Sequence, residues 1–385
     1  MNKSIPYGKQ WIDEEDIQSV VDVLRGELIT TGPKVLEFES KLAERTGAKY
    51  AVAYSNGTAA LHAACFAAGI GEGDEVITTP ITFAASANCA LYVGARPVFA
   101  DICSDTYNID PAEIEKNITK KTRAIISVDF AGQPCDLDRI MQIAKEHDLI
   151  VIEDAAHSIG ATYKGRNIGS IADMTTFSFH PVKAITTGEG GAVTTDSKEL
   201  YEKLLMFRAH GITREKNKLI NSEEGPWFYE QQFLGYNYRL TDIQAALGIS
   251  QLRKLDKFVG LRRNFAKQYS DAFKNVEGII VPHQNVDGNS AWHIYVTQLE
   301  LEKFSIGRKE FFAELLKCSI GPNVHYIPVY YHPYYQELGY KKGICPKAEA
   351  LYDRMLTLPL FAKMEQNEVD YVINMTKSIV EKYRR

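Results

Sequence analysis

The sequence predicts an α/β fold, with a large domain built on a mostly parallel sheet covered by helices and a smaller C-terminal α+β domain. Short apolar runs alternate with helical stretches between about residues 50 and 193. The 385 residues exceed what one hydrophobic core usually accommodates. After a long helical run, the pattern changes to mixed strand and helix. We therefore expect a large domain over residues 1–250 and a small domain over residues 251–385.

The predicted strands of the large domain are nearly continuous apolar runs. Such runs are typical of parallel strands that are buried on both faces. The runs are YAVAYS (50–55), EVITTP (75–80), RPVFADI (96–102), RAIISVDF (123–130), LIVIEDAA (149–156), TTFSFH (175–180) and GGAVTT (190–195).

Helices are predicted between these strands. The alanine-rich run GTAALHAACFAAGI (57–70) ends at a glycine turn, and DLDRIMQIAKEHD (136–148) places its apolar residues at helical spacing. A single long helix is predicted over residues 241–273, and the domain boundary is expected within it.

Composition excludes several classes of partner. The net charge is −5 and lysines and arginines never run beyond pairs, which argues against nucleic acid or an anionic membrane as the main partner. No apolar segment reaches the length of a signal peptide core or a membrane span, so we expect a cytoplasmic protein. The six cysteines form no C-x-x-C pair, so we expect reduced thiols and no metal site.

The stretch TFSFHPVKAITTGEGGAV (176–193) places Lys183 between a short apolar strand and a glycine-rich turn. The glycines let the backbone double back close to the strand, which fixes the lysine over the edge of the sheet. On this motif alone, a surface lysine in a hairpin loop is an equally good interpretation.

Two other motifs favour a functional lysine. SNGTAAL (55–61) puts Gly57 at the start of a helix that directly follows a strand, where free N–H groups favour a phosphate. LIVIEDAAHS (149–158) ends a strand in Asp154, followed by His157, and ligands bind at the carboxyl ends of parallel strands. Taken singly, the first motif is also a common turn, and Asp154 could simply cap the next helix.

Together these motifs predict a site for pyridoxal 5'-phosphate (PLP), which needs a phosphate anchor, a partner for the pyridine nitrogen and an amine for a Schiff base. A charge pair about 4 Å apart at an effective dielectric constant near 20 is worth roughly 4 kcal/mol, or about three pKa units. Asp154 can therefore keep the ring nitrogen protonated. Lys183 can act as general acid and base, a role typically worth about 10² to 10⁴ in rate.

Five motifs in order resemble the DegT/DnrJ/EryC1/StrS group of fold-type-I aminotransferases over essentially the whole chain. They are SNGTAAL, ITFAASANC, EDAAHSIGA, SFHPVKAITTGEGG and GYNYRLTDIQAALG. The resemblance implies a transaminase that aminates nucleotide-linked keto sugars, with PLP as cofactor, pyridoxamine 5'-phosphate (PMP) in the half-reaction and L-glutamate as amino donor. It also implies a homodimer with shared active sites.

The resemblance implies specific roles for residues of this chain. The catalytic residues are Lys183 as the Schiff-base lysine, Asp154 as the pyridinium partner and His157 beside the ring hydroxyl. The further cofactor-binding residues are Gly57, Thr58 and Ser178 at the phosphate, Phe83 over the ring, and Asn237, which reaches the phosphate of the partner subunit. The structural alternatives are a core position for Phe83 and a turn-stabilising role for Asn237.

Lysine rather than histidine at position 183 favours transamination over dehydration. The N-terminal segment and VHYIPVYYHPYY (324–335) resemble the branch that makes UDP-4-amino-4,6-dideoxy-N-acetyl-β-L-altrosamine in pseudaminic acid biosynthesis. The alternative is an aminotransferase for another UDP- or dTDP-4-keto-6-deoxy sugar. The resemblance suggests that Tyr7, Leu28, Ile29, Thr30, Thr31, His325, Tyr326, Ile327 and Pro328 contact the sugar nucleotide.

Some of these assignments have structural alternatives. His325 is expected to supply positive charge to the nucleotide, although the aromatic segment around it could instead pack on its own domain. Arg239 is a candidate for the glutamate carboxylate because a guanidinium matches its geometry, and a structural ion pair is an equal alternative.

The sequence argues against two other classes of function. A PLP-binding sensor without catalytic activity would not need both a catalytic set and a sugar-contact set. A nicotinamide-dependent oxidoreductase would need a G-x-G-x-x-G turn after the first strand, and SNGTAA lacks the first and third glycines.

Overall fold

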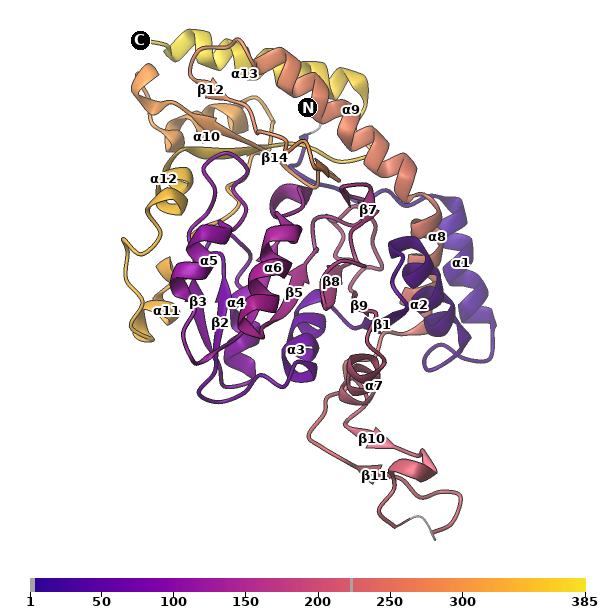
Figure 1. The fold of residues 1–385 in the computed structure, drawn as a ribbon. Helices are drawn as coiled ribbons and strands as arrows, with labels where there is room; N and C mark the ends of the chain where they lie inside the picture. The colour runs from indigo at the N-terminus through magenta and orange to yellow at the C-terminus, as the bar shows by residue number, and fades with distance from the viewer. Residues whose placement is uncertain (1–3, 222–223) are drawn as a thin grey trace.

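The computed structural model describes residues 4–221 and 224–385 and is built around a seven-stranded sheet (Figure 1). The strand order is β1-β9-β8-β5-β4-β2-β3, and β9 alone runs against the other six. The predicted α/β fold is confirmed, and each predicted strand run overlaps one strand of this sheet. The strands are β1 (Tyr50–Tyr54), β2 (Glu75–Thr78), β3 (Arg96–Phe99), β4 (Thr122–Val128), β5 (Ile150–Asp154), β8 (Met174–Ser178) and β9 (Gly191–Thr195).

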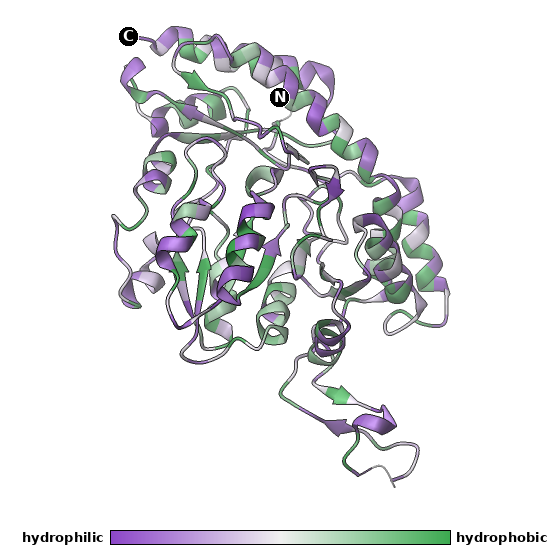
Figure 2. Cartoon of the chain, viewed as in Figure 1, coloured by the Kyte–Doolittle hydropathy of each residue, from purple (hydrophilic) through white to green (hydrophobic). Residues whose placement is uncertain are grey.

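Both faces of the sheet are apolar because successive side chains of a strand point to opposite faces. Ile126 and Ile152 pack on one face, whereas Ile125 and Val151 pack on the other, and all four are fully buried. Figure 2 shows the hydrophobic residues concentrated on the strands and mixed with polar residues on outer helices such as α6. One face is covered by α3 (Gly57–Ala67), α4 (Ala85–Tyr92) and α7 (Lys198–Phe207), and the other by α2 (Pro33–Thr46), α5 (Pro111–Asn117), α6 (Leu137–His147) and α8 (Asp242–Arg253).

The predicted helices at 57–70 and 136–148 are confirmed as α3 and α6, but the prediction of one long helix over 241–273 is wrong. The chain forms two helices there, α8 and α9 (Leu255–Phe273), which meet at Lys254. The amine of Lys254 pairs with Asp13 and Asp16 at the start of α1 (Glu14–Arg25). This contact with a distant segment accompanies the break and has no local sequence signal.

The C-terminal part has its own core around a three-stranded sheet. Phe265 and Tyr269 of α9 pack there with Phe311 and Val372, whereas Leu255 at the start of α9 belongs to the core of the large sheet. Because α9 joins both cores, the division at residues 250 and 251 stays a prediction. The elements are β12 (Ile279–Ile280), β14 (Tyr295–Leu299), β15 (Met355–Leu358), α10 (Arg308–Lys317), α11 (Pro333–Glu337), α12 (Pro346–Arg354) and α13 (Gln366–Tyr383).

Two smaller sheets complete the fold. The hairpin of β10 (Ile212–Thr213) and β11 (Glu230–Gln231) projects away from the body of the chain (Figure 1). The other sheet is formed by β6 (Thr162–Tyr163), β7 (Arg166–Asn167) and β13 (Gly288–Asn289). Within the described ranges, none of the helices combines the length and apolar character that a membrane crossing requires.

Candidate active site

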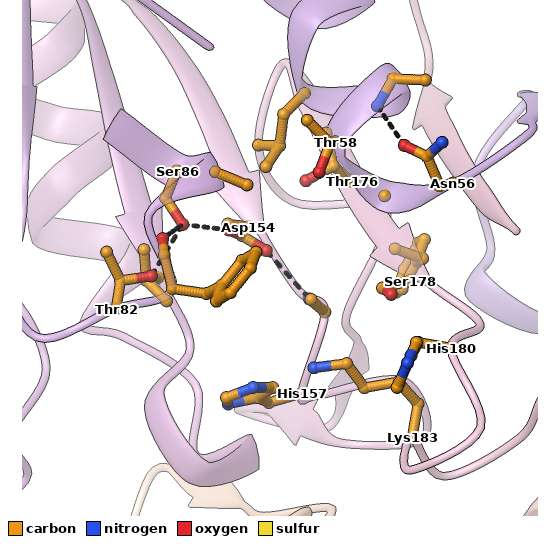
Figure 3. Close-up of a pocket in the computed structure, with 18 of the residues that line it drawn as sticks. Asn56, Thr58, Thr82, Ser86, Asp154, His157, Thr176, Ser178, His180 and Lys183 are labelled. Carbon is orange, nitrogen blue, oxygen red and sulfur yellow. Dashed lines mark hydrogen bonds between the residues drawn. The ribbon is translucent and has the colours of Figure 1, made fainter. Parts of the chain in front are cut away.

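A pocket of about 870 Å³ lies where β5 and β8 end. Its walls come from the start of α3, the end of β5, the loop between β8 and β9, and segments of the C-terminal part. Figure 3 shows Lys183 with its amine directed toward His157, and Asn56, Thr58 and Ser178 on another side of the pocket. The carboxyl ends of parallel strands are the expected place for a ligand in such a sheet.

The start of α3 approaches the backbone of β8 and β9 closely and is a candidate for an anion site. Asn56 caps the helix, because its Oδ1 accepts a hydrogen bond of 2.8 Å from the N–H of Ala59. A Cβ added to Gly57 would lie 3.0 Å from the Cβ of Ser178, and one added to Gly191 would lie 2.4 Å from the carbonyl oxygen of Asn56. Glycine at both positions lets the helix start meet the ends of β8 and β9. Free N–H groups at a helix start favour an anion there.

Asp154 is a buried carboxylate held from both sides. Its Oδ2 accepts a hydrogen bond of 2.6 Å from the hydroxyl of Ser86, and its Oδ1 accepts one of 3.1 Å from the N–H of Ala156. The Ser86 hydroxyl also lies 2.7 Å from that of Thr82. Burial raises the pKa of Asp154, while these hydrogen bonds and the charge of Lys183 oppose the rise. The carboxylate is therefore fixed in orientation and faces the lysine.

Lys183 lies in the loop between β8 and β9, where its N–H donates a hydrogen bond of 2.9 Å to the carbonyl of His180. Burial of the amine lowers the pKa of Lys183 to about 8, and the charge of Arg262 also lowers it, whereas Asp154 acts in the opposite direction. At pH 7 roughly one amine in ten is therefore neutral, far more than for an ordinary lysine. A neutral amine is the form that can act as nucleophile or base.

Two neighbouring histidines, with ring planes tilted by 40°, form another wall. The rings of His157 and His293 have their centroids 4.2 Å apart, and Nε2 of His157 lies 3.1 Å from the hydroxyl of Tyr326. Burial lowers the pKa of both histidines well below the usual range, so both are neutral at pH 7. Among the described residues, the buried Nδ1 of His157 has no hydrogen-bond partner. That nitrogen is available to a polar atom of a ligand.

His325 is neutral, contrary to the sequence-based expectation of a positive charge. Burial lowers the pKa of His325 to about 4, and the nearby charge of Lys183 lowers it further. Its Nδ1 lies 3.0 Å from the hydroxyl of Thr357, and its Nε2 lies 3.3 Å from the side-chain nitrogen of Asn323. His325 therefore contributes shape and hydrogen bonding to the pocket.

Most residues singled out in the sequence come together in this pocket. Phe83 is 63% exposed, so the alternative of an ordinary core position does not hold for it. The predicted residues that line the pocket are Tyr7, Gly57, Thr58, Phe83, Asp154, His157, Ser178, Lys183, His325 and Tyr326.

Other candidates lie outside the pocket of a single chain. Leu28 and Ile29 are 54% and 51% exposed in the connection between α1 and α2, and Asn237 is exposed where its backbone pairs with Ala209. Arg239 pairs through its backbone with Tyr54. The candidates outside the pocket lining are Leu28, Ile29, Thr30, Thr31, Asn237, Arg239, Ile327 and Pro328.

The sequence reasoning missed several residues of the pocket wall. Ser86 lies in the motif ITFAASANC and Asn56 in SNGTAAL, so local signals were present for both. Tyr238 lies beside Asn237 in the motif GYNYRLTDIQAALG, so a local signal was present for it as well. His293 comes from a segment far along the chain and carries no local signal. Thr82, Thr176 and His180 also line the pocket.

The model of the DegT/DnrJ/EryC1/StrS aminotransferase family matches residues 10–377. The chain belongs to this family.

The relatives of the chain match it over nearly their full lengths. It is 45% identical to the spore coat polysaccharide biosynthesis protein SpsC of Bacillus subtilis, over 98% of each chain. It is 38% identical to a UDP-4-amino-4,6-dideoxy-N-acetyl-β-L-altrosamine transaminase of Campylobacter jejuni, over 99% of each chain. A Streptococcus pneumoniae protein solved in PMP and PLP forms is 36% identical, with a TM-score of 0.91 over 98% of this chain and 99% of that one.

These findings identify a PLP-dependent sugar aminotransferase of fold type I. The residues of the pocket fit PLP independently of these comparisons. The start of α3 offers backbone N–H groups to a phosphate, Asp154 offers a carboxylate, and the unpartnered Nδ1 of His157 can meet a polar ring substituent.

Adding a side chain at Gly57 should weaken the binding of PLP. A methyl group in Gly57→Ala would lie 3.0 Å from Ser178 Cβ and would push α3 away from β8. We expect a dissociation constant for PLP raised about tenfold, equivalent to about 1.4 kcal/mol, in an absorbance titration. The matched control is Gly260→Ala in α9, where an added Cβ meets nothing within 4 Å. Equal affinities in wild type and Gly57→Ala would contradict the assignment of the cradle.

The burial of Lys183 should also make the free energy of unfolding depend on pH. Folding lowers the pKa of Lys183 from 10.5 to about 8, so between these values the unfolded chain binds more protons than the folded one. Stability from this group therefore rises with pH across that window, by about 3 kcal/mol in total. We expect the unfolding free energy of cofactor-free wild type, measured in urea, to rise by this amount relative to Lys183→Met. Parallel pH curves for the two proteins would refute the burial of the amine.

Proposed function

We propose that the protein transfers an amino group from L-glutamate to C4 of a UDP-linked 4-keto-6-deoxy-N-acetylhexosamine, giving UDP-4-amino-4,6-dideoxy-N-acetyl-β-L-altrosamine. The observation that carries the general chemistry is the convergence of Lys183, Asp154 and the glycine-lined start of α3 in one pocket. The choice of sugar is supported by the 38% identity to a transaminase of that name over almost the whole chain.

The residues of the pocket divide the chemistry between them. The bound cofactor supplies an electron sink that stabilises negative charge at the substrate carbon. Asp154 would pair with the ring nitrogen and favour its protonated form, because an opposite charge stabilises the cation. Hydrogen bonds from Ser86 and Ala156 fix the orientation of this carboxylate. Lys183, with a pKa of about 8, takes a proton from the substrate carbon at its Nζ and returns it on the other side of the reaction.

The phosphate and the ring are held by other residues. Gly57, Thr58 and Ser178 would hold the phosphate at the start of α3, and Phe83 would contact the ring. His157 offers its free Nδ1 to the ring hydroxyl, and its Nε2 faces the hydroxyl of Tyr326 at 3.1 Å. This contact orients the imidazole, because the ring cannot rotate without losing it.

The sugar nucleotide is proposed to occupy the side of the pocket formed by Tyr7, His325 and Tyr326. The three aromatic rings pack in a series, with centroids 5.2 Å apart between Tyr7 and His325 and 4.8 Å apart between His325 and Tyr326. A neutral imidazole and two phenols suit the hydroxyls and the acetamido group of an amino sugar. They do not supply charge for a diphosphate.

The proposed homodimer would complete the site. Leu28, Ile29 and Asn237 are exposed in one chain, and Trp227 and Leu234 around the projecting hairpin are each 73% exposed. Large apolar side chains in such positions favour contact with another protein surface. We propose that Asn237 reaches the phosphate held by the partner subunit, and that the 28–31 segment contacts the sugar nucleotide there.

The substrate is tested by comparing UDP- and dTDP-linked 4-keto-6-deoxy sugars as amino acceptors, with L-glutamate as donor and the products identified by mass spectrometry and NMR. We expect the highest kcat/KM for the UDP-linked N-acetylated 4-keto sugar that yields the altrosamine product. If the enzyme prefers another acceptor, the proposed sugar is wrong, but the assignment as an aminotransferase stands. Other acceptors are included because the chain is also 45% identical to SpsC, a spore coat polysaccharide biosynthesis protein.

Removal of the lysine tests the catalytic assignment. Lys183→Ala should lower kcat by about 10³-fold or more, because both the covalent attachment and the proton transfer are lost. Lys164→Ala, on the exposed β6–β7 turn, should retain normal turnover and serves as the control. Normal turnover by Lys183→Ala would refute the assignment of Lys183 as the catalytic lysine. Absence of amine transfer by wild-type protein that has bound PLP would instead favour the non-catalytic sensor.

Shared active sites are tested by mixing two variants. Lys183→Ala and Asn237→Ala each lack one component, but a mixed dimer contains one site with both residues. Random exchange of subunits should restore roughly a quarter of wild-type activity. No recovery after verified subunit exchange would place Asn237 in the site of its own chain or outside any site.

A further inference from the structure

Arg262 is a fully buried arginine on α9, with 1% of its surface exposed. Its Nη1 donates hydrogen bonds of 2.9 Å to the carbonyl oxygens of both His293 and Leu360, and its Nη2 donates one of 3.4 Å to the carbonyl of Lys183. One guanidinium thus joins the loop of the proposed catalytic lysine to two segments of the C-terminal part.

The three carbonyl groups that accept hydrogen bonds from Arg262 lie in or next to the wall of the pocket. His293 lines the pocket and its ring contacts that of His157. The N–H of Leu360 donates a hydrogen bond of 3.0 Å to the carbonyl of Tyr7, another residue of the pocket wall. The side chain of Arg262 therefore contacts the backbone of two pocket-lining residues, His293 and Lys183, and is linked to a third, Tyr7, through Leu360.

The charge of Arg262 has no acidic partner among the residues that the structure describes. None of the carboxylates there lies within 4.0 Å of it, and its buried Nε has no hydrogen-bond partner. Burial lowers the pKa of Arg262 to about 10, so the side chain stays charged at pH 7. A buried cation held only by carbonyl oxygens is costly in stability, and a role beyond packing would explain it.

We propose that Arg262 is a positioning residue for Lys183, which fixes the lysine loop against the C-terminal part and places a permanent positive charge near the amine. The inference rests on the role proposed for Lys183 and deepens it. Removing a like charge makes protonation of the amine easier, so loss of Arg262 should raise the proton affinity of Lys183. The arginine would thereby help to keep the amine neutral when the cofactor is absent.

Other groups around the amine also act on its proton. Asp154 at the end of β5 favours the charged amine, whereas the buried histidines are neutral and sense the lysine charge themselves. The groups that face Lys183 from the surrounding elements are Asp154, His157, Arg262, His293, His325 and Tyr326. Arg262 is the fixed cation of this set, so its effect persists across the pH range in which the histidines could titrate.

The test is competitive labelling of Lys183 in the cofactor-free full-length protein. Trace acetic anhydride acylates only neutral amines, and mass spectrometry of the peptide that contains Lys183 gives the midpoint as pH varies. Wild type should titrate near pH 8. In Arg262→Gln the midpoint should rise by about one unit, so that labelling at pH 7 falls about tenfold.

The adjacent Arg263 is a matched control. It also donates hydrogen bonds to backbone carbonyls, at 2.8 Å to Ser290 and 3.1 Å to Gly160, but it does not contact Lys183. Arg263→Gln should leave the Lys183 midpoint within a few tenths of a unit of wild type. A midpoint that moves equally in both variants, or in neither, would overturn the proposal.

Arg262→Lys tests the positioning role in a variant that retains the charge. A single ammonium cannot keep the planar fork that reaches three carbonyls. Amide hydrogen exchange of the peptide covering residues 180–187 should become several-fold faster in Arg262→Lys and remain unchanged in Arg263→Lys. Unchanged exchange in Arg262→Lys would also overturn the proposal. Neither measurement uses a sugar, so a wrong substrate assignment would leave both results intact.

Discussion

The site depends on burying the amine of Lys183 near the buried carboxylate of Asp154. Burial disfavours the charged amine and the charged carboxylate alike, whereas their mutual attraction favours both charges. The balance leaves an amine that is neutral in a useful fraction at neutral pH and a carboxylate whose orientation Ser86 and Ala156 fix. The fold meets this requirement because β5 and β8 are adjacent parallel strands that run toward the same edge of the sheet, where Asp154 pairs with Thr176. Asp154 closes β5, and the loop after β8 returns Lys183 over the same edge.

The same edge of the sheet carries a second constraint, which is steric. The start of α3 can approach β8 and β9 only where the facing residues lack a side chain, and Gly57 and Gly191 supply that space. The helix start, the carboxylate and the lysine are thereby held on one rigid frame. The remaining walls come from the C-terminal part, through His293, His325 and Tyr326. The pocket therefore exists only when the two cores pack together.

Sequence reasoning succeeded where a local pattern determines the structure. The buried strands are continuous apolar runs. Gly57 begins α3, Asp154 ends β5 and Lys183 lies in the glycine-rich loop after β8, and the three motifs together favoured one site although each alone had a structural alternative. It failed where the deciding contact is distant. The break at Lys254 accompanies ion pairs with Asp13 and Asp16. The neutrality of His325 follows from burial by segments that no local pattern reveals.

The covalent attachment point of the cofactor tests the central claim most directly. Wild-type protein loaded with PLP is reduced with borohydride, digested and analysed by mass spectrometry, beside Lys183→Ala treated in the same way. The account predicts the phosphopyridoxyl group on Lys183 and its absence at that peptide in the variant. Attachment at a different lysine of wild type, or none in protein that has bound PLP, would contradict it.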